Sequence, residues 1–452
     1  MAIVAVLLAL AAIRCGGEKA GPVVGRSKPV NVIIFLADDL GWKDVGYHGS
    51  EIRTPNIDRM AREGVVLERY YTSPLCTPTR ARLMTGKCAL RFGLATNVRP
   101  DGSLWVPRDT PLLSEVLGAA GYRTALVGKW HLGFREGYRP SERGFEFSYG
   151  ILGSWIDHFT HERKGELDWH RNGEPVREEG YSADLLAREA VRWIRGATGK
   201  PFFLYMPFTV PHAPVQAPDR WLREYAAIED PVRRAYAGMV SAMDEAIGRV
   251  LHALDETGAA DNTIVFFAGD NGANEHQGGS NGNLRGAKWT TYEGCLRVPA
   301  LFWFPGRLAP RTIDAFVSNL DVYPTMLAAA RVAVPTQWKG RRFAPDGVNL
   351  LPVLEGRAEP PHRVLPYTFV GRKRVWGALY DPPWKLVVHW RKDTGEAPPE
   401  LYDVVADPGE RVDLAAREQR KVEEMFSRFR SWWMDCTGKD FPIAPDVPVA
   451  DR

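Results

Sequence analysis

The sequence predicts an α/β protein whose mainly parallel β-sheet is flanked by helices, with a small C-terminal α+β region that carries an antiparallel sheet. Continuous apolar runs alternate with amphipathic helical patterns over most of the chain. Polar clusters follow these runs directly, at the position where open α/β sheets bind ligands. After about residue 355 the pattern changes to two strands joined by a proline-bearing turn. We therefore expect a leader at residues 1–26, a large domain at 27–355 and a C-terminal domain at 356–452.

Strands are expected where apolar residues run without interruption, because strands of a parallel sheet are buried on both faces. In the large domain these runs lie at residues 31–37, 65–67, 124–128, 201–206, 262–268 and 298–304. Helices are expected where apolar residues recur at helical spacing, at residues 54–62, 111–120, 181–195, 233–257 and 321–330. The C-terminal region should contain antiparallel strands at residues 374–380 and 384–390 and a closing helix at 410–433.

The net charge of the chain and its apolar N-terminal run bear on the partners and the location to expect. A formal net charge of +3 on 452 residues gives no electrostatic reason to expect nucleic acid or an anionic membrane surface as a partner. Residues 1–15 are mostly apolar, but this run is too short to span a bilayer, so no transmembrane span is expected. The run instead resembles the apolar core of an export signal. We expect a protein that is periplasmic, secreted or lipid-anchored at Cys15; a plain secretory signal and a misassigned start are the alternatives.

The five cysteines do not form a disulfide scaffold. Cys15 lies in the leader, and Cys76 is a candidate catalytic residue. Only Cys88, Cys295 and Cys436 remain, so at most one disulfide is possible. Buried free thiols are the expected state of these three residues.

Two polar pairs end buried strands and predict a metal site. Asp38 and Asp39 follow the first strand, and Asp270 and Asn271 follow the strand at 262–268. Their side chains offer only oxygen donors, which suits a hard divalent cation such as Ca²⁺ or Mg²⁺. The structural alternative is that each pair caps a turn or a helix.

Five cationic or titratable residues lie beside glycine, proline or tryptophan and are expected in loops. Lysine, arginine and histidine side chains that converge beside a divalent metal form an oxyanion-binding site. A solvated surface lysine or a structural loop histidine is the alternative for any one of them. The five residues are Arg80, Lys129, His131, His212 and Lys288.

Cys76 has three interpretations before any family is considered. It could be an inert buried cysteine, which is the common state of a lone cysteine. It could be a thiol nucleophile with a histidine base, although the spacing matches no cysteine protease signature. It could also be modified to an aldehyde, whose hydrate is an oxygen nucleophile that can later expel its product.

The segment Cys76-Thr77-Pro78-Thr79-Arg80, followed by Met84-Thr85-Gly86-Lys87, resembles the signature of the type I, formylglycine-dependent sulfatases. The family pattern is C-x-P-S-R with a downstream L-T-G-R-like element, so Thr79 replaces a serine and Lys87 an arginine. Within the family the chain is similar to the arylsulfatase B, or N-acetylgalactosamine-4-sulfatase, branch. Other segments match in the family's order, at residues 37–41, 128–133, 211–214, 269–272, 285–289, 400–403 and 407–410.

The resemblance implies an alkaline-phosphatase-like fold and a Cys76 that is converted to C-formylglycine. A formylglycine-generating enzyme or another sulfatase maturase is then a partner. One hydroxyl of the aldehyde hydrate would attack sulfur, with Asp270 as its proton acceptor, and the other would later expel sulfate. The implied cofactor is Ca²⁺, in preference to Mg²⁺. Its implied ligands are Asp38, Asp39, Asp270, Asn271 and an oxygen of the modified Cys76.

The resemblance also assigns the cationic residues. Arg80 and Lys129 would hold the hydrate, and Lys129 would contact substrate as well. His212 and Lys288 would bind sulfate oxygens, with His212 as the acid that protonates the leaving alcohol. His131 would take the proton of the remaining hydroxyl. Fixed cations and a placed acid suit a transition state with charge on the leaving oxygen and on the sulfuryl oxygens.

The function implied is a sulfuric ester hydrolase that acts on a sulfated carbohydrate, of GalNAc-4-sulfate type, or on an aryl sulfate. In the loop at residues 153–159, Asp157 or His158 would reach the sulfate or the sugar; a purely structural loop is the alternative. Two other functions stay open on the same scaffold. One is a phosphate mono- or diester hydrolase, and the other is a non-catalytic protein that binds sulfated glycans.

Overall fold

The computed structural model describes residues 28–442, except 100–101, 103, 198 and 372. The proposed leader and Cys15 therefore lie outside the described residues. In the part of the chain that is described, no helix is both long and apolar enough to cross a membrane.

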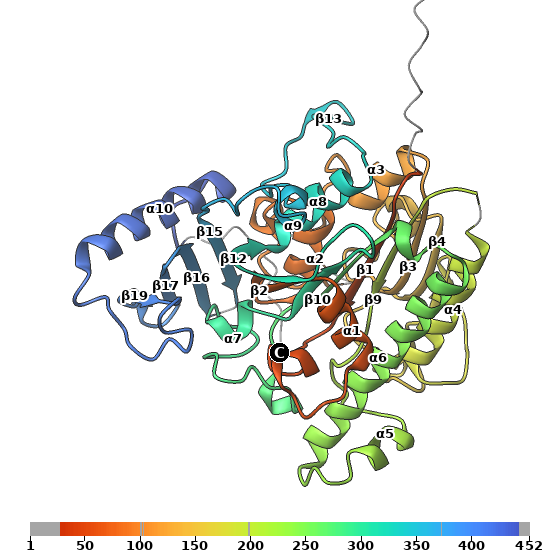
Figure 1. The fold of residues 1–452 in the computed structure, drawn as a ribbon. Helices are drawn as coiled ribbons and strands as arrows, with labels where there is room; N and C mark the ends of the chain where they lie inside the picture. The colour runs from red at the N-terminus through yellow and green to blue at the C-terminus, as the bar shows by residue number, and fades with distance from the viewer. Residues whose placement is uncertain (1–27, 100–101, 103, 198, 372, 443–452) are drawn as a thin grey trace, which may run out of the picture.

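A ten-stranded sheet forms the centre of the molecule (Figure 1). Its central strands are parallel, whereas β11 and the short β7 and β8 run antiparallel to their neighbours. In spatial order the strands are β12 (Arg311–Ser318), β2 (Val65–Tyr71), β11 (Ala300–Trp303), β10 (Thr263–Gly269), β1 (Asn31–Ala37), β9 (Phe202–Pro207), β3 (Arg123–Lys129), β4 (Phe147–Ile151), β7 (His170–Arg171) and β8 (Glu174–Pro175). The predicted mainly parallel sheet is thus confirmed.

Helices cover both faces of this sheet because alternate side chains of each strand point to opposite faces. On β1, Ile34 and Leu36 belong to one core, and Ile33 and Phe35 to the other. One face is covered by α2 (Cys76–Thr85), α3 (Leu113–Ala119), α8 (Val322–Ala329) and α9 (Leu351–Leu354). The opposite face is covered by α1 (Pro55–Glu63), α4 (Ser182–Gly196) and α6 (Pro231–Glu256), with α5 (Asp219–Glu224) packed on α6.

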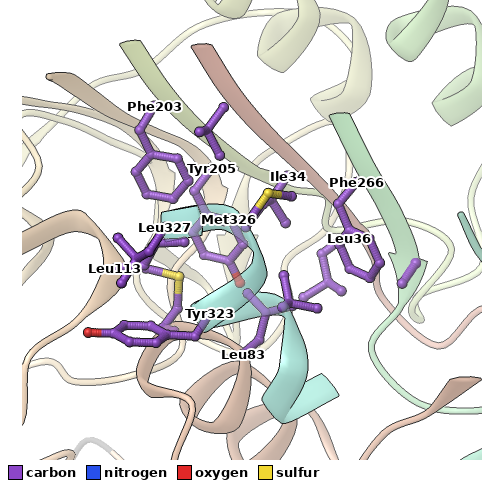
Figure 2. Packing of buried hydrophobic residues seen from close by; sticks show 14 of the residues in the cluster. Ile34, Leu36, Leu83, Leu113, Phe203, Tyr205, Phe266, Tyr323, Met326 and Leu327 are labelled. Carbon is purple, nitrogen blue, oxygen red and sulfur yellow. The ribbon is translucent and has the colours of Figure 1, made fainter. Parts of the chain in front are cut away.

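The core on the α8 side shows how the helices are fixed to the sheet (Figure 2). Tyr323 and Met326 of α8 and Leu83 of α2 face the strand residues Phe203 and Phe266. Each such side chain contributes about 1.5–3 kcal/mol when fully buried. Through these contacts helix α2, whose first residue is Cys76, is packed against one face of the sheet.

A second, antiparallel sheet follows in the C-terminal region. It contains β15 (Leu365–Val370), β16 (Arg374–Asp381), β17 (Trp384–Arg391), β18 (Gly395–Glu396) and β19 (Glu400–Asp403), and α10 (Gln419–Thr437) packs against it. The antiparallel pair at 374–380 and 384–390 is therefore confirmed. The domain boundary at 355 stays a prediction. Short elements complete the described chain: β5 (Glu162–Arg163), β6 (Glu166–Leu167), α7 (Glu293–Leu296), β13 (Gln337–Trp338) and β14 (Arg341–Arg342).

The closing helix begins nine residues later than predicted, at Gln419 instead of residue 410. Glu410 has a left-handed backbone (φ 51°), which a helix interior does not allow. The carboxylate of Asp407 accepts hydrogen bonds from the backbone N–H groups of Arg411 and Val412 and so stabilises a turn there. The apparent helical pattern before residue 419 is therefore overridden by this turn.

Candidate active site

Cys76 is the first residue of helix α2, an element that the sequence analysis did not predict. All ten residues of α2 are buried, so the helix has no apolar stripe and its sequence lacks helical periodicity. The hydroxyl of Thr79 accepts a hydrogen bond from the N–H of Ser73 (3.0 Å) and donates one to its carbonyl (3.2 Å). Thr79 thus supplies the hydroxyl group of the serine that it replaces in the sulfatase signature.

The predicted metal-binding residues converge in one buried cluster. Single ligand atoms of Asp38, Asp39, Cys76 and Asp270 all lie within 4.8 Å of one another. Adjacent parallel strands cause this convergence, since Ala37 at the end of β1 pairs with Gly269 at the end of β10. The next residues on both strands then emerge at the same edge of the sheet.

The backbone around this cluster is held in an unusual conformation. Asp39 adopts a left-handed conformation (φ 68°), and its N–H donates to Asp270 Oδ1 at 3.1 Å. The side-chain amide of Asn271 donates to Asp39 Oδ1 at 2.7 Å. His131 and Trp289 at the same site also have positive φ, at 52° and 73°. Such strain is concentrated at functional sites, where the surrounding contacts enforce it.

Three cations pair with the three carboxylates. Lys129 Nζ lies 2.7 Å from Asp38 Oδ2, and Lys288 Nζ lies 2.6 Å from Asp39 Oδ1. Arg80, which is fully buried, lies 2.8 Å from Asp270 Oδ2 and 3.7 Å from Asp38 Oδ1. The charges of these six side chains balance. No charge among these six buried side chains is therefore left unpaired.

The expectation that all five residues lie in loops is wrong for two of them. Arg80 is on helix α2, and Lys129 is the last residue of strand β3. A helix and a strand give these side chains fixed directions, which suits residues that must hold charge in place. His131, His212 and Lys288 do lie in connections between the regular elements.

The Cys76 side chain lies at the centre of this charge network. Its sulfur lies 3.4 Å from Asp38 Oδ1 and 3.6 Å from Asn271 Oδ1, either of which can accept the single thiol proton, and Lys288 Nζ donates to the sulfur at 3.7 Å. Burial, assisted by the charge of Asp270, raises the pKa of the thiol above its ordinary value. Reactive thiolates need a lowered pKa, so the environment does not favour a cysteine-thiolate nucleophile.

Titration of the neighbouring groups follows from burial and charge. Burial opposes ionisation of Asp39, but Lys288 and His212 outweigh it and lower the pKa of this carboxyl to about 2. Burial and the charge of Asp38 raise the pKa of Asp270. Burial lowers the pKa of His212 to about 4, and burial together with Lys129 lowers the pKa of His131 well below its ordinary value. The Nδ1 atom of His131 is buried and has no hydrogen-bond partner in the described chain.

A pocket of about 560 Å³ opens above this cluster. Cys76, His212 and Lys288 lie among its lining residues, which also include residues that the sequence analysis missed. These missed lining residues are Leu75, Thr96, Asn97, Ser154, Trp155, Trp289, Phe369, Gly371, Lys373 and Arg374. Two of the pocket's aromatic residues had a sequence signal: Trp289 follows Lys288 directly, and Trp155 lies in the loop at 153–159 that was expected to contact substrate.

Comparison with known proteins identifies the family. The sulfatase family model matches residues 30–332, and a model for the C-terminal part of N-sulphoglucosamine sulphohydrolase matches residues 287–431. Arylsulfatase J of Mus musculus is 33% identical over 89% of this chain and 75% of its own length. The chain belongs to the sulfatase family. The sulfatase is accordingly a sulfuric ester hydrolase with the alkaline-phosphatase-like fold.

Other relatives of this sulfatase act on or bind carbohydrates. N-acetylgalactosamine-6-sulfatase of Homo sapiens is 36% identical over 74% of this chain and 67% of its own length. The crystal structure of Ps i-CgsB in complex with k-i-k-neocarrahexaose superimposes with a TM-score of 0.84 at 32% identity. That alignment covers 91% of this chain and 94% of the other. Particular closeness to arylsulfatase B stays a prediction.

Asp157 and His158 of the sulfatase do not line the pocket. Asp157 Oδ1 accepts from the N–H groups of Phe159 and Thr160, as in a turn. His158 is buried behind His212, with Nε2 3.0 Å from the His212 carbonyl oxygen and Nδ1 3.0 Å from Ser182 Oγ. These contacts support the loop and the backbone of His212.

The buried ring of His158 should make the sulfatase less stable in acid. Burial lowers the pKa of His158 to about 4, below its value in the unfolded chain. The unfolded chain then binds more protons, so stability is complete above about pH 6.5 and is lost as pH falls towards 4, by up to about 3 kcal/mol. Between pH 7 and 4.5 the melting temperature of His158→Gln should therefore fall less than that of the wild type. His252→Gln, at an exposed histidine, is the matched control and should follow the wild type. Equal acid sensitivity of the wild type and His158→Gln would contradict this assignment.

Proposed function

We propose that this sulfatase hydrolyses the sulfate ester of a sulfated carbohydrate, with the modified side chain of residue 76 as its nucleophile. The observation that carries the proposal is the convergence of three cations and three carboxylates on Cys76 at the base of an aromatic-walled pocket. Tryptophan and phenylalanine walls suit the apolar faces of sugar rings. The carbohydrate-directed relatives support the same class of substrate.

The Cys76 sulfur would be replaced, after modification to C-formylglycine, by oxygen atoms on the same Cβ. The sulfur therefore stands in for these oxygens in the contacts described above. The hydrated aldehyde would supply an oxygen nucleophile and an exit route for sulfate. A formylglycine-generating enzyme or another maturase would perform the conversion. Thr79 retains the hydroxyl group of the signature serine, and in the folded chain this hydroxyl binds the Ser73 backbone.

The carboxylate cluster fits a hard divalent cation. Asp38, Asp39 and Asp270 offer carboxylate oxygens, and Asn271 offers an amide oxygen; these are the donors that Ca²⁺ and Mg²⁺ prefer. We propose Ca²⁺, whose tolerance of irregular geometry suits a cluster that also contains residue 76. When bound, the cation would stabilise negative charge on the nucleophile and on the sulfate oxygens.

The chain's own residues then have separable roles. Lys288 and Lys129 would neutralise the sulfuryl oxygens, while Arg80 fixes Asp270 and thereby the position of the nucleophile. Asp270 would accept the proton of the attacking hydroxyl. The buried, unpartnered Nδ1 of His131 would accept the second proton.

His212 is proposed as the acid that protonates the leaving alcohol. Its Nδ1 lies 2.7 Å from the Ala213 carbonyl oxygen, so Nδ1 carries a proton and Nε2 faces the site, 3.7 Å from Asp39 Oδ2. The lowered pKa leaves the free ring neutral at pH 7. An anionic substrate beside the ring would favour its protonated form, so that binding of the sulfate ester itself would charge the acid.

A metal test needs no turnover. Adding Ca²⁺ to chelator-treated protein should stabilise the folded state by mass action, by about 2.7 kcal/mol at a concentration of one hundred times Kd. The melting temperature should rise accordingly. Asp39→Asn should abolish this shift. Asp244→Asn, at a buried carboxylate that binds Asn56 and the Ile57 N–H, should retain it. A shift that survives Asp39→Asn would place the cation elsewhere.

The proposed function is tested by the substrate preference of protein that carries the modification. Mass spectrometry of the peptide that contains Cys76 should show conversion to the aldehyde after co-expression with a maturase. Converted protein should hydrolyse 4-nitrophenyl sulfate faster than 4-nitrophenyl phosphate. The reverse preference would favour the phosphate-ester alternative, and glycan binding without sulfate release would favour the binding-protein alternative. An export signal at residues 1–26 is part of the proposal and is tested by the location of the full chain in cell fractions.

A further inference from the structure

We propose that Lys373 and Arg374, which together with Gly371 are called the hairpin tip below, form a second anion-binding subsite that recognises another anionic group on the same sulfated oligosaccharide. The group would be a second sulfate or a uronate carboxylate on the neighbouring sugar ring. The inference deepens the proposed function and rests on it, because the first anion is the sulfate ester that lies over Cys76.

The hairpin tip is part of the pocket wall. Gly371, Lys373 and Arg374 line the same pocket as Cys76 and Lys288. The catalytic cluster and the tip therefore face one continuous space of about 560 Å³. Pockets of about 300–1,000 Å³ hold ligands of drug size, so there is room beyond a single sulfate group.

The tip is held in place relative to the catalytic part. The N–H of Gly371 donates to the carbonyl of Arg374 at 2.8 Å, which closes the hairpin turn. The N–H of Val370 donates to the carbonyl of Ala95 at 3.2 Å, directly before the pocket residues Thr96 and Asn97. These bonds fix the hairpin against the large domain, so the spacing between the two anion sites is set by the fold.

The charge of the pocket lining is one-sided. Among the described lining residues, three are permanently cationic and none is acidic: Lys288, Lys373 and Arg374 form the cationic set. At the base, Lys288 is already paired with Asp39. At the rim, the Lys373 side chain is exposed and the Arg374 guanidinium lies 5.8 Å from the Phe369 ring centroid and 5.9 Å from that of Trp376. A guanidinium supported by aromatic rings and a neighbouring ammonium form a site for sulfate or carboxylate.

Aromatic side chains also line this pocket. Trp155, Trp289 and Phe369 line the pocket together with the two cationic ends. Flat aromatic surfaces bind sugar faces without regard to charge, whereas the cations at either end read anionic substituents. The sulfatase would therefore select chains in which two anionic groups are carried on adjacent rings.

The experiment compares substrates that differ only in the second charge. Sulfate release is measured on 4-nitrophenyl sulfate and on three disaccharides: one with a single sulfate ester, one with a second sulfate on the neighbouring ring, and one with a uronate there. We expect the wild type to have at least about tenfold higher kcat/KM on one or both doubly charged disaccharides than on the singly charged one. The two doubly charged substrates distinguish sulfate from carboxylate as the second group.

Lys373→Glu should remove this preference, lowering kcat/KM on the doubly charged disaccharide about 10- to 100-fold while changing 4-nitrophenyl sulfate hydrolysis by less than about threefold. Lys200→Glu is the matched control, since Lys200 is an exposed lysine that does not line the pocket. A wild type without preference for the second charge, or an equal loss on all substrates, would overturn the subsite. Absence of sulfate release from every substrate by converted wild type would instead overturn the proposed function.

Discussion

Cys76→Ala should abolish sulfate release, with a loss of at least about 10⁴-fold in kcat, while the protein remains folded. Removal of a covalent nucleophile leaves only binding and electrostatic assistance, which accounts for losses of this size in other hydrolases. The substitution removes one buried sulfur and its weak hydrogen bonds to Asp38 and Asn271. Helix α2 keeps its core contacts and the hydrogen bonds between Thr79 and Ser73.

Cys295→Ala is the matched control for this prediction. Cys295 is also a fully buried thiol whose pKa is raised by burial, but its sulfur contacts the Pro74 carbonyl oxygen and not the carboxylate cluster. We expect this variant to keep kcat within about a factor of ten. Activity is measured with 4-nitrophenyl sulfate, and folding is monitored by melting temperature. An active enzyme whose residue 76 is an unmodified cysteine would overturn the proposed nucleophile.

Lys385→Met should destabilise the protein by about 3–5 kcal/mol, the usual cost of breaking a buried ion pair from one side. Lys385 is fully buried, with Nζ 3.1 Å from Glu293 Oε1 and 2.8 Å from Glu410 Oε1. Glu293 also accepts hydrogen bonds from Tyr71 (3.0 Å) and Tyr380 (2.5 Å), so the lysine connects residues from both sheets. Its loss would leave two carboxylates that face each other without a cation.

The pH dependence of this deficit tests its electrostatic origin. Burial raises the pKa of Glu410 to about 7 even with Lys385 present, so the stability linked to its protonated form is complete below about pH 4.5 and lost as pH rises through 7. The Lys385→Met deficit, measured by chemical unfolding, should therefore be larger at pH 8 than at pH 5. Adding Glu293→Gln and Glu410→Gln should recover part of it. A deficit below 1 kcal/mol that does not vary with pH would contradict this explanation.

The cluster of carboxylates and cations around Cys76 could be predicted from sequence because the ends of neighbouring parallel strands meet at one edge of the sheet. Asp38 and Asp270 follow buried strands, and the equal register of β1 and β10 brings them together. Lys129 at the end of β3 follows the same rule. Helix α2 could not be predicted in this way, since a helix that is buried on every side has no hydrophobic periodicity.

The pocket rim was missed for a different reason. Lys373 and Phe369 lie far from Cys76 in the sequence, and only the packing of the second sheet brings them to the same pocket. The sequence predicts a strand at 374–380 but does not show which of its side chains reach the pocket. Likewise, residue 410 fits a helical pattern in the sequence, which does not show that Glu410 is buried beside Lys385.

The burial of helix α2 bears on when the proposed modification could take place. In the folded molecule Cys76 is 1% exposed, and every other residue of the helix is buried as well. The proposed maturase would need access to the backbone around this side chain, which the folded core encloses and exposes only by local unfolding. On the proposed function, conversion of residue 76 would therefore precede closure of the core, and a chain that folded first would keep an unmodified, inactive Cys76.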